Sequence, residues 1–286
     1  MASIGDILTI VLVFMIQQAK SRLFAEPSAS CGQSVFAKNP YFLRDYRSRV
    51  RALNSVFVFK TVFLGLIMMP HFVTAQEIVA AHVSREIPLD AAYPASEWQS
   101  TQPITFSSDW QGLNPDPARQ TSVRVLWNEQ TLYLRSECRY RDLHVFSDSD
   151  PNGRRDQLWD RDVVEVFLQP DPSREHFYKE FEVAPNAMWI DLDIFPGGRS
   201  DLKSGMKRSA YLDRQSRTWS VELAIPMKSL TEHFDPQAVW RVNFYRVEGL
   251  SEPRAYLAWQ PTNTPKPNFH VPSAFGRLRF APPPKP

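Results

Sequence analysis

The sequence predicts an all-β protein, an antiparallel two-sheet β-sandwich of jelly-roll type. The first observation is a series of about ten short runs in which apolar and polar residues alternate with the two-residue period of a strand. The second is that residues 87–280 contain no helical pattern long enough for a βαβ crossover. Successive strands are therefore expected to pair in antiparallel hairpins and to fill one domain.

Each strand is assigned from its alternation and from the turn residues beside it. In "TWSVELAIP", Trp219, Val221 and Leu223 share one face and are expected to be core. A short helix is expected in "MKSLTEHF", directly after Pro226. The predicted strands are 123–127, 131–138, 163–168, 178–184, 188–195, 209–213, 218–226, 240–248, 255–260 and 275–280.

Residues 1–75 differ from the rest and have the order of a secretory signal. A basic stretch precedes the apolar run 61–69, and small residues lead to a predicted cleavage after Ala75. The apolar run is shorter than the roughly 20 residues of a spanning helix, although an uncleaved anchor is the alternative. Because the signal begins far from Met1, and bacteria can start at a valine codon, Val50 is a candidate start. We expect a bacterial protein that is secreted, periplasmic or in the cell envelope, with no stable membrane span after cleavage.

The remaining chain is divided into a polar lead-in (76–86), the folded domain (87–280) and a disordered proline-rich tail (281–286). Residues 1–75 carry a net charge of +5, whereas the whole chain carries +2, so the rest of the chain carries about −3. A nucleic-acid partner is not expected, because this part has no basic run. Of the two cysteines, only Cys138 follows Ala75, and its strand parity predicts a buried, inert thiol.

The stretch "LWDRDVVEVFLQP" (158–170) places a carboxylate inside an apolar strand. Val164 and Val166 point to one face of this strand and Glu165 points to the other. Trp159 would lie about 20 Å from Glu165 along an extended chain, so the two meet only if residues 159–162 turn back. A Trp stacks on sugar C–H groups and a carboxylate accepts hydrogen bonds from hydroxyls, so the pair is suited to carbohydrate recognition.

Two other interpretations of this stretch stay open. Trp159 could be a structural plug and Glu165 a strand residue paired with a basic side chain. Alternatively, Asp160, Asp162 and Glu165 could supply the two carboxyl groups of a glycoside hydrolase. Clustered acids at the start of one strand more often form turns, pair in salt bridges or bind calcium, so we expect no enzymatic activity from this chain. A hydrolase on another chain could act beside it.

Seven blocks carry a family resemblance. They are "TSVRVLWNEQTLYLRSECRYRD", "LWDRDVVEVFLQP", "FYKEFEVAP", "WSVELAIP", "WRVNFYRVEG", "YLAWQPT" and "FHVPSAFGRLRF". In this order and spacing, the chain resembles carbohydrate-binding module family 9-like domains over about 87–280. The resemblance implies a β-sandwich that binds small sugars or the ends of glycan chains, often beside enzymes of polysaccharide catabolism.

The resemblance also implies site residues. Family members hold a sugar between two aromatic rings, which match Trp159 and Phe269 here, and the acid that follows the first ring matches Glu165. Asn268 and His270 flank Phe269 as possible polar contacts. Family members with a known sugar site carry Trp at the second ring, and a basic residue where Glu182 stands, so the bound sugar stays open.

Further candidates come from the residues themselves and from the family. Asn243, in "WRVNFYRVEG", has the strand parity opposite the core and is predicted to contact the sugar. Family members bind structural calcium, for which Asp142, Asp148 and Asp150 are weak candidates here. A haem-binding sandwich, with Met188, Met206 and His270 as axial ligands, is a less favoured alternative. The other is a cell-surface interaction module with a degenerate sugar site.

Overall fold

The computed structural model describes residues 76–150 and 152–284. The predicted signal segment before Ala75 and the candidate start Val50 lie outside these residues. The described strands are β1 (Glu77–His82), β2 (Ile104–Phe106), β3 (Thr121–Trp127), β4 (Thr131–Arg139), β5 (Val163–Gln169), β6 (Tyr178–Val183), β7 (Trp189–Phe195), β8 (Gly198–Asp201), β9 (Lys207–Asp213), β10 (Thr218–Pro226), β11 (Trp240–Glu248), β12 (Ala255–Ala258) and β13 (Gly276–Phe280). The short helices are η1 (Ser96–Ser100), η2 (Pro117–Arg119), η3 (Leu158–Asp160), α3 (Met227–Leu230) and η4 (Pro272–Ala274).

All ten predicted strands are present, and the helix expected after Pro226 is the single turn α3. The all-β class is therefore confirmed. Residues 281–284 form no helix or strand. Within the described residues, no helix is long and apolar enough to cross a bilayer.

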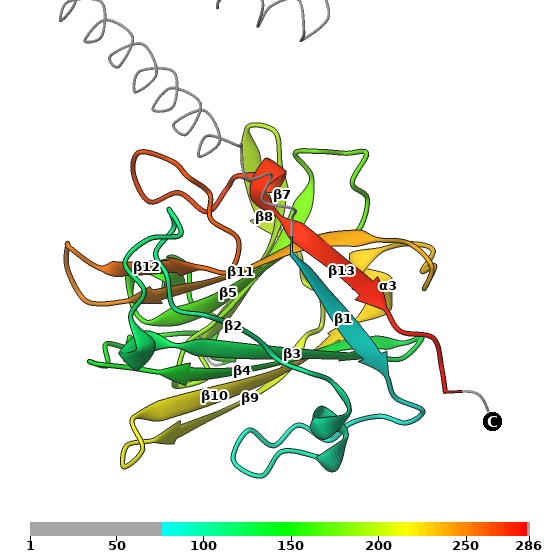
Figure 1. The fold of residues 1–286 in the computed structure, drawn as a ribbon, viewed down its shortest axis with the longest axis horizontal. Coiled ribbons are helices and arrows are strands. Elements are labelled where there is room, and N and C mark those ends of the chain that lie inside the picture. Colours follow the sequence, from blue (N-terminus) through cyan, green and yellow to red (C-terminus); the bar gives the residue numbers. More distant parts are fainter. Residues whose placement is uncertain (1–75, 151, 285–286) are drawn as a thin grey trace, which may run out of the picture. The chain divides into compact units, whose positions relative to one another are not determined.

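The strands form one curled, mixed sheet with the order β8-β7-β6-β5-β11-β13-β1-β3-β4-β10-β9 across the described residues. β12 pairs with β11, and β2 pairs with β3. The prediction of a purely antiparallel arrangement is wrong at β1, which runs parallel to both β13 and β3 (Figure 1). β1 and β13 come from opposite ends of the domain, so no hairpin turn forces them to run in opposite directions.

β1 also connects the two halves of the sheet. Residues 77–80 pair with β13, and residues 81–82 pair with β3. Hydrogen bonding is therefore continuous through β1, and the predicted division into two separate sheets is not confirmed. The same strand lies in the segment expected to be a polar lead-in, and it belongs to the fold because Ile78 and Ala80 are buried in the core.

The two faces of β5 and its neighbours contact different hydrophobic clusters. The main core receives Val164, Val166 and Leu168 from β5, together with residues of β3, β4 and β10 from the other half of the sheet. Trp219 and Trp240 lie in this main core, as predicted, with 0% and 2% exposure. A second cluster covers the opposite face of β5, β6, β7 and β11, and we call it the outer cluster: Leu158, Val163, Phe167, Tyr178, Ala184, Met188, Ile190, Leu192, Tyr245, Val247, Ala258, Phe269 and Phe275.

Cys138 is fully buried in the main core, as its strand parity predicts. Burial raises the pKa of its thiol to about 11, so the thiolate form is scarce at neutral pH. This agrees with the predicted inert thiol.

The main core makes a testable prediction about stability. Phe181 on β6 is 1% exposed in the main core, so Phe181→Ala leaves a cavity and should lower the free energy of unfolding by about 3 to 5 kcal/mol. Tyr211→Ala is the control, because Tyr211 is 45% exposed on β9, and it should change stability by about 0.5 kcal/mol. Urea unfolding of both variants measures the difference. Equal losses would contradict this description of the core.

Candidate functional site

A pocket of about 200 Å³ opens on the outer face of β5 and β6. This volume is below the roughly 300 to 1,000 Å³ of pockets for drug-sized ligands, so it suits a small ligand. Five of the six predicted site residues line it: Trp159, Glu165, Asn268, Phe269 and His270. The other lining residues are Glu180, Arg199, Val247, Arg254, Tyr256 and Pro267.

Trp159 reaches the pocket because the chain turns immediately before β5. Gln157 has a left-handed backbone (φ 55°) and precedes the single turn η3 that carries Trp159. The turn is held by Arg254, which also lines the pocket and donates a 2.8 Å hydrogen bond to the carbonyl oxygen of Trp159. Asp162 fixes the start of the strand by accepting a 2.8 Å bond from the N–H of Gly249. Trp159 and Glu165 therefore border one pocket, as the predicted turn requires.

Three aromatic rings border the pocket. Trp159 is half-buried and carries the guanidinium of Arg199 4.6 Å from its ring centre. Phe269 is only 8% exposed, because one face of its ring stacks on Tyr245 with 4.1 Å between centroids. Tyr256 is half-buried and meets Phe269 edge to face at 6.1 Å. Tyr256 thus adds an aromatic surface that the sequence reasoning missed.

Asn243 does not line the pocket, which departs from the prediction that it contacts a sugar. It is fully buried, and its amide nitrogen donates to the Tyr245 hydroxyl (2.7 Å) and to the carbonyl of Gln260 (2.9 Å). Tyr245 in turn donates to the carbonyl of Phe269 at 3.0 Å. The side chain of Asn243 thus positions the loop of Phe269 from behind.

The polar residues beside Phe269 are both exposed. The side-chain oxygen of Asn268 accepts a 3.0 Å bond from the backbone N–H of His270. His270 Nδ1 lies 2.6 Å from the Tyr178 hydroxyl, and its ring packs against Phe167. These contacts orient both side chains at the rim of the pocket.

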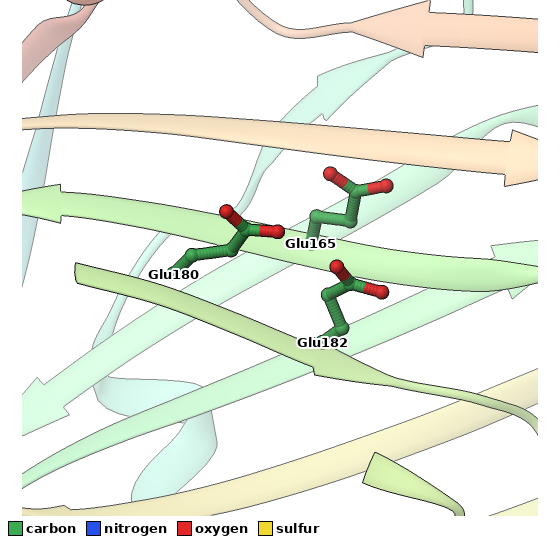
Figure 2. Close-up of side chains that lie close together, drawn as sticks. All are labelled: Glu165, Glu180 and Glu182. Carbon is green, nitrogen blue, oxygen red and sulfur yellow. The ribbon is translucent and has the colours of Figure 1, made fainter. Parts of the chain in front are cut away.

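Three glutamates gather on one face of the sheet (Figure 2), and two of them, Glu165 and Glu180, line the pocket. Glu165 on β5 is directly opposite Glu182 on β6, and Glu180 is two residues away on the same face of β6. Each offers a carboxylate oxygen within 4.8 Å of the others, and their exposures are 3% (Glu165), 3% (Glu180) and 0% (Glu182). At an effective dielectric of about 20, each pair of charges at such a distance repels by roughly 3 to 4 kcal/mol. Without a counterion, the three are therefore not all ionised.

Burial is the main cause of raised pKa values in this cluster. It raises the pKa of Glu165 well above its ordinary value, and the nearby charge of Glu180 adds to the effect, against an opposing contribution from Arg254. It likewise raises the pKa of Glu182, with further contributions from Glu165 and Glu180. Burial and the same acids also raise the pKa of the Tyr178 hydroxyl. Because burial and mutual repulsion disfavour the ionised carboxylates, binding of protons or of a cation stabilises this cluster.

Two arginines supply the basic side chains of the pocket. Arg199 comes from β8 and Arg254 from the segment before β12. The guanidinium of Arg254 donates to Glu252, to the Trp159 carbonyl and to the Tyr256 hydroxyl. Arg199 pairs with Asp156 at 3.3 Å. Glu182 thus occupies the position where the family resemblance implies a base, and the bases come from other elements.

The calcium candidates from the sequence are not brought together. Asp148 pairs with Arg155 at 3.5 Å, and Asp150 accepts bonds from the N–H groups of Asn152 and Arg154. Asp142 borders a different hollow, beside Glu248. Calcium at these aspartates stays a prediction.

The proposed haem ligands are also separated. Met206 belongs to the main core, whereas Met188 belongs to the outer cluster on the opposite face of the sheet. His270 is at the rim and is paired with Tyr178. The three side chains therefore do not converge on one cofactor.

Comparison with known proteins gives the family. Residues 89–281 match the model of the carbohydrate family 9 binding domain-like family. The chain belongs to this family. The match covers most of the described domain, including every residue that lines the pocket.

Relatives of this family 9 domain occur alone and within larger proteins. An extracellular protein of Arthroderma benhamiae is 26% identical over 206 residues, which are 65% of this chain and 88% of that protein. Endo-1,4-beta-xylanase A of Thermotoga neapolitana is 24% identical over 184 residues, which are 64% of this chain and 16% of the xylanase. A family 9 module from Caldicellulosiruptor kristjanssonii, solved with cellotriose, has a TM-score of 0.52 at 18% identity, covering 72% of this chain and 93% of that module.

Several residues in or beside the pocket were not predicted from the sequence, and the strand pattern indicates the position of some of them but not of others. In "YKEFEVA", Glu180 and Glu182 alternate with Phe181 and Val183, so strand parity alone could have placed both acids on the face of Glu165. Arg199 had no such signal, because all four residues of β8 are polar or glycine and exposed. Tyr256 lies in a predicted strand, but only the pairing of β12 with β11 brings it beside the pocket.

The glutamate cluster makes stability depend on pH. Because the folded-state pKa of Glu182 is raised, its contribution is fully present below the ordinary value of 4.5 and is lost as pH rises through the folded pKa. In buffer with a chelator, the free energy of unfolding should therefore fall as the pH is raised above about 4.5, and Glu182→Gln should reduce this fall. Burial is the main cause that raises the pKa of Asp162 to about 6, so ionisation of Asp162 also lowers the free energy of unfolding as pH rises. Part of the pH dependence should therefore remain in Glu182→Gln.

Urea unfolding across this pH range measures the effect. Glu232→Gln is the matched control, since Glu232 is exposed, and it should follow the unmodified protein. An unchanged pH profile in Glu182→Gln would show that the cluster does not titrate as described.

Proposed function

We propose that this protein is a non-catalytic carbohydrate-binding protein that holds a sugar in the pocket of Trp159 and Glu165. The observation that carries the proposal is the turn at η3, which brings a half-buried Trp and a buried carboxylate to the same small pocket. A flat apolar ring beside hydrogen-bonding groups is what sugar recognition requires.

In the proposed complex, the aromatic residues of the pocket pack against the sugar, and its charged residues form hydrogen bonds with the sugar hydroxyls. A sugar ring stacks on Trp159, and Phe269 and Tyr256 close the apolar side of the pocket. Glu165 accepts hydrogen bonds from sugar hydroxyls, whereas Arg199 donates them. The small volume favours a monosaccharide or the terminal unit of a glycan over the middle of a chain.

The carboxylates favour binding over hydrolysis. A glycosidase needs two carboxyl groups on opposite sides of the scissile bond, roughly 5 to 9 Å apart. Here Glu165, Glu180 and Glu182 rise from adjacent strands on one face of the sheet, with oxygens within 4.8 Å of one another. No second carboxylate among the residues lining the pocket comes from an opposite wall.

The context of the proposed function is extracellular polysaccharide degradation. The xylanase and the extracellular protein described above support this context, as does the module solved with cellotriose. We infer that the protein is exported from the cell and retains glycans near degradative enzymes.

Replacing the stacking ring tests the proposal. In calorimetric titrations of the full chain with cellotriose and with the best ligands of a glycan array, Trp159→Ala should weaken binding by about 1 to 3 kcal/mol, the range of a removed aromatic anchor. Tyr93→Ala is the control, because Tyr93 is 84% exposed and lies outside the pocket, and its affinity should stay unchanged.

Two outcomes would contradict the proposal. Sugar affinity that is unchanged in a less stable Trp159→Ala variant would identify Trp159 as a structural plug. No binding to any glycan would favour the interaction-module alternative.

A further inference from the structure

The glutamate cluster holds four buried carboxylate oxygens for which the described residues supply no hydrogen-bond donor. They are Oε1 of Glu165, Oε2 of Glu180 and both oxygens of Glu182. Buried polar groups are nearly always hydrogen-bonded, and a buried charge is nearly always paired or bound to a metal. Glu182 is fully buried, and no N–H or hydroxyl group of the described residues donates to either of its oxygens. Its side-chain neighbour for hydrogen bonding is Glu180, itself an acid of the cluster.

The cationic side chains nearby are committed to other partners. Arg254 donates to Glu252, the Trp159 carbonyl and the Tyr256 hydroxyl. Arg199 pairs with Asp156 and lies over the Trp159 ring. None of the hydrogen bonds of these two arginines reaches Glu165, Glu180 or Glu182. Burial raises the pKa of Glu165, and the charge of Arg254 offsets only part of this rise. The charge of Arg199 likewise offsets part of the rise in the pKa of Glu182 that burial causes. Within the described residues, neither arginine pairs directly with the cluster.

We propose that Glu165, Glu180 and Glu182 together bind one calcium ion at the floor of the pocket. Oxygen ligands of calcium lie 2.3 to 2.6 Å from the ion, so two of them are separated by at most about 5 Å. The three carboxylates satisfy this limit, since one oxygen from each lies within 4.8 Å of the others (Figure 2). A calcium ion would also cancel most of the charge that burial makes unfavourable.

The donor set selects the class of cation. All three donors are carboxylates with no nitrogen or sulfur ligand, which favours hard cations over zinc or copper. Calcium accepts irregular geometry, whereas magnesium requires a near-ideal octahedron. Because Glu165 and Glu180 also line the pocket, the remaining coordination positions face its opening, where water or a sugar hydroxyl would complete the shell.

Carboxylates coordinate calcium in their ionised form, so calcium competes with protons at this site. Binding should therefore strengthen as pH rises and should release protons. The calcium site itself does not depend on sugar binding, whereas coordination of a sugar hydroxyl rests on the proposed function.

Calorimetric titration of the chelator-treated full chain with calcium chloride tests the inference. We expect one ion per chain, a higher thermal midpoint with calcium, and proton release seen as different heats in buffers of different ionisation enthalpy. Glu182→Gln and Glu180→Gln keep the side-chain shape and should weaken calcium binding by at least about tenfold. Circular dichroism verifies that both variants fold.

Glu232→Gln is the matched control, since Glu232 is exposed and lies outside the pocket, and it should leave calcium affinity unchanged. Asp148→Asn tests the acidic loop, and calcium bound by the glutamates should survive it. Absence of calcium binding in a folded protein would overturn the inference, as would binding that survives Glu182→Gln and is lost in Asp148→Asn. Trp159→Ala separates the two proposals, because it should weaken sugar binding and keep the calcium stoichiometry. Calcium binding by a protein that takes no sugar would support the site and refute the proposed function.

Discussion

The pairing of β5 with β6 in a register that opposes Glu165 to Glu182 is the constraint on which the site depends. Because side chains alternate along a strand, the residues that send Val164, Val166 and Phe181 into the main core must send Glu165, Glu180 and Glu182 to the other face. A slip of one residue would bury the acids in the core. The hydrophobic core therefore fixes where the carboxylates lie.

The outer cluster packs on the face of β5 and β6 that carries the glutamates and forms the surroundings of the pocket. Phe167, Tyr178 and Tyr245 cover the sheet beside the glutamates, and Phe269 stacks on Tyr245. The hydrogen bonds from Asn243 to Tyr245 and from Tyr245 to the Phe269 carbonyl hold the loop of Phe269. On the opposite side, Arg254 holds the turn of Trp159. Both aromatic walls are thus held by hydrogen bonds within the protein, which lowers the cost of ordering on binding.

Local periodicity predicted much of the fold and the centre of the site. The alternation of β5 placed Glu165 opposite the core, and the distance along an extended chain required the turn at Trp159, which η3 supplies. Local alternation could not predict features of the fold that depend on pairing between strands far apart in the sequence. The parallel pairing of β1 depends on two strands far apart in sequence, and its short apolar pattern resembled a polar lead-in.

The errors at the site have the same origin. Asn243 has the predicted parity, but β12 and its following residues cover it, so it supports the pocket without bordering it. Arg199 lies on a strand with no alternation, and its place beside Trp159 follows from the β7–β8 hairpin. Glu182 was interpreted through the family resemblance as a lost basic residue, whereas its neighbours show that it belongs to a cluster of acids.

A crystal structure of the protein with bound cellotriose would show directly where the sugar binds. The terminal sugar ring should lie on Trp159, with its hydroxyls within hydrogen-bond distance of Glu165. A sugar bound elsewhere, such as in the larger hollow between the β5–β6 connection and α3, would contradict this placement.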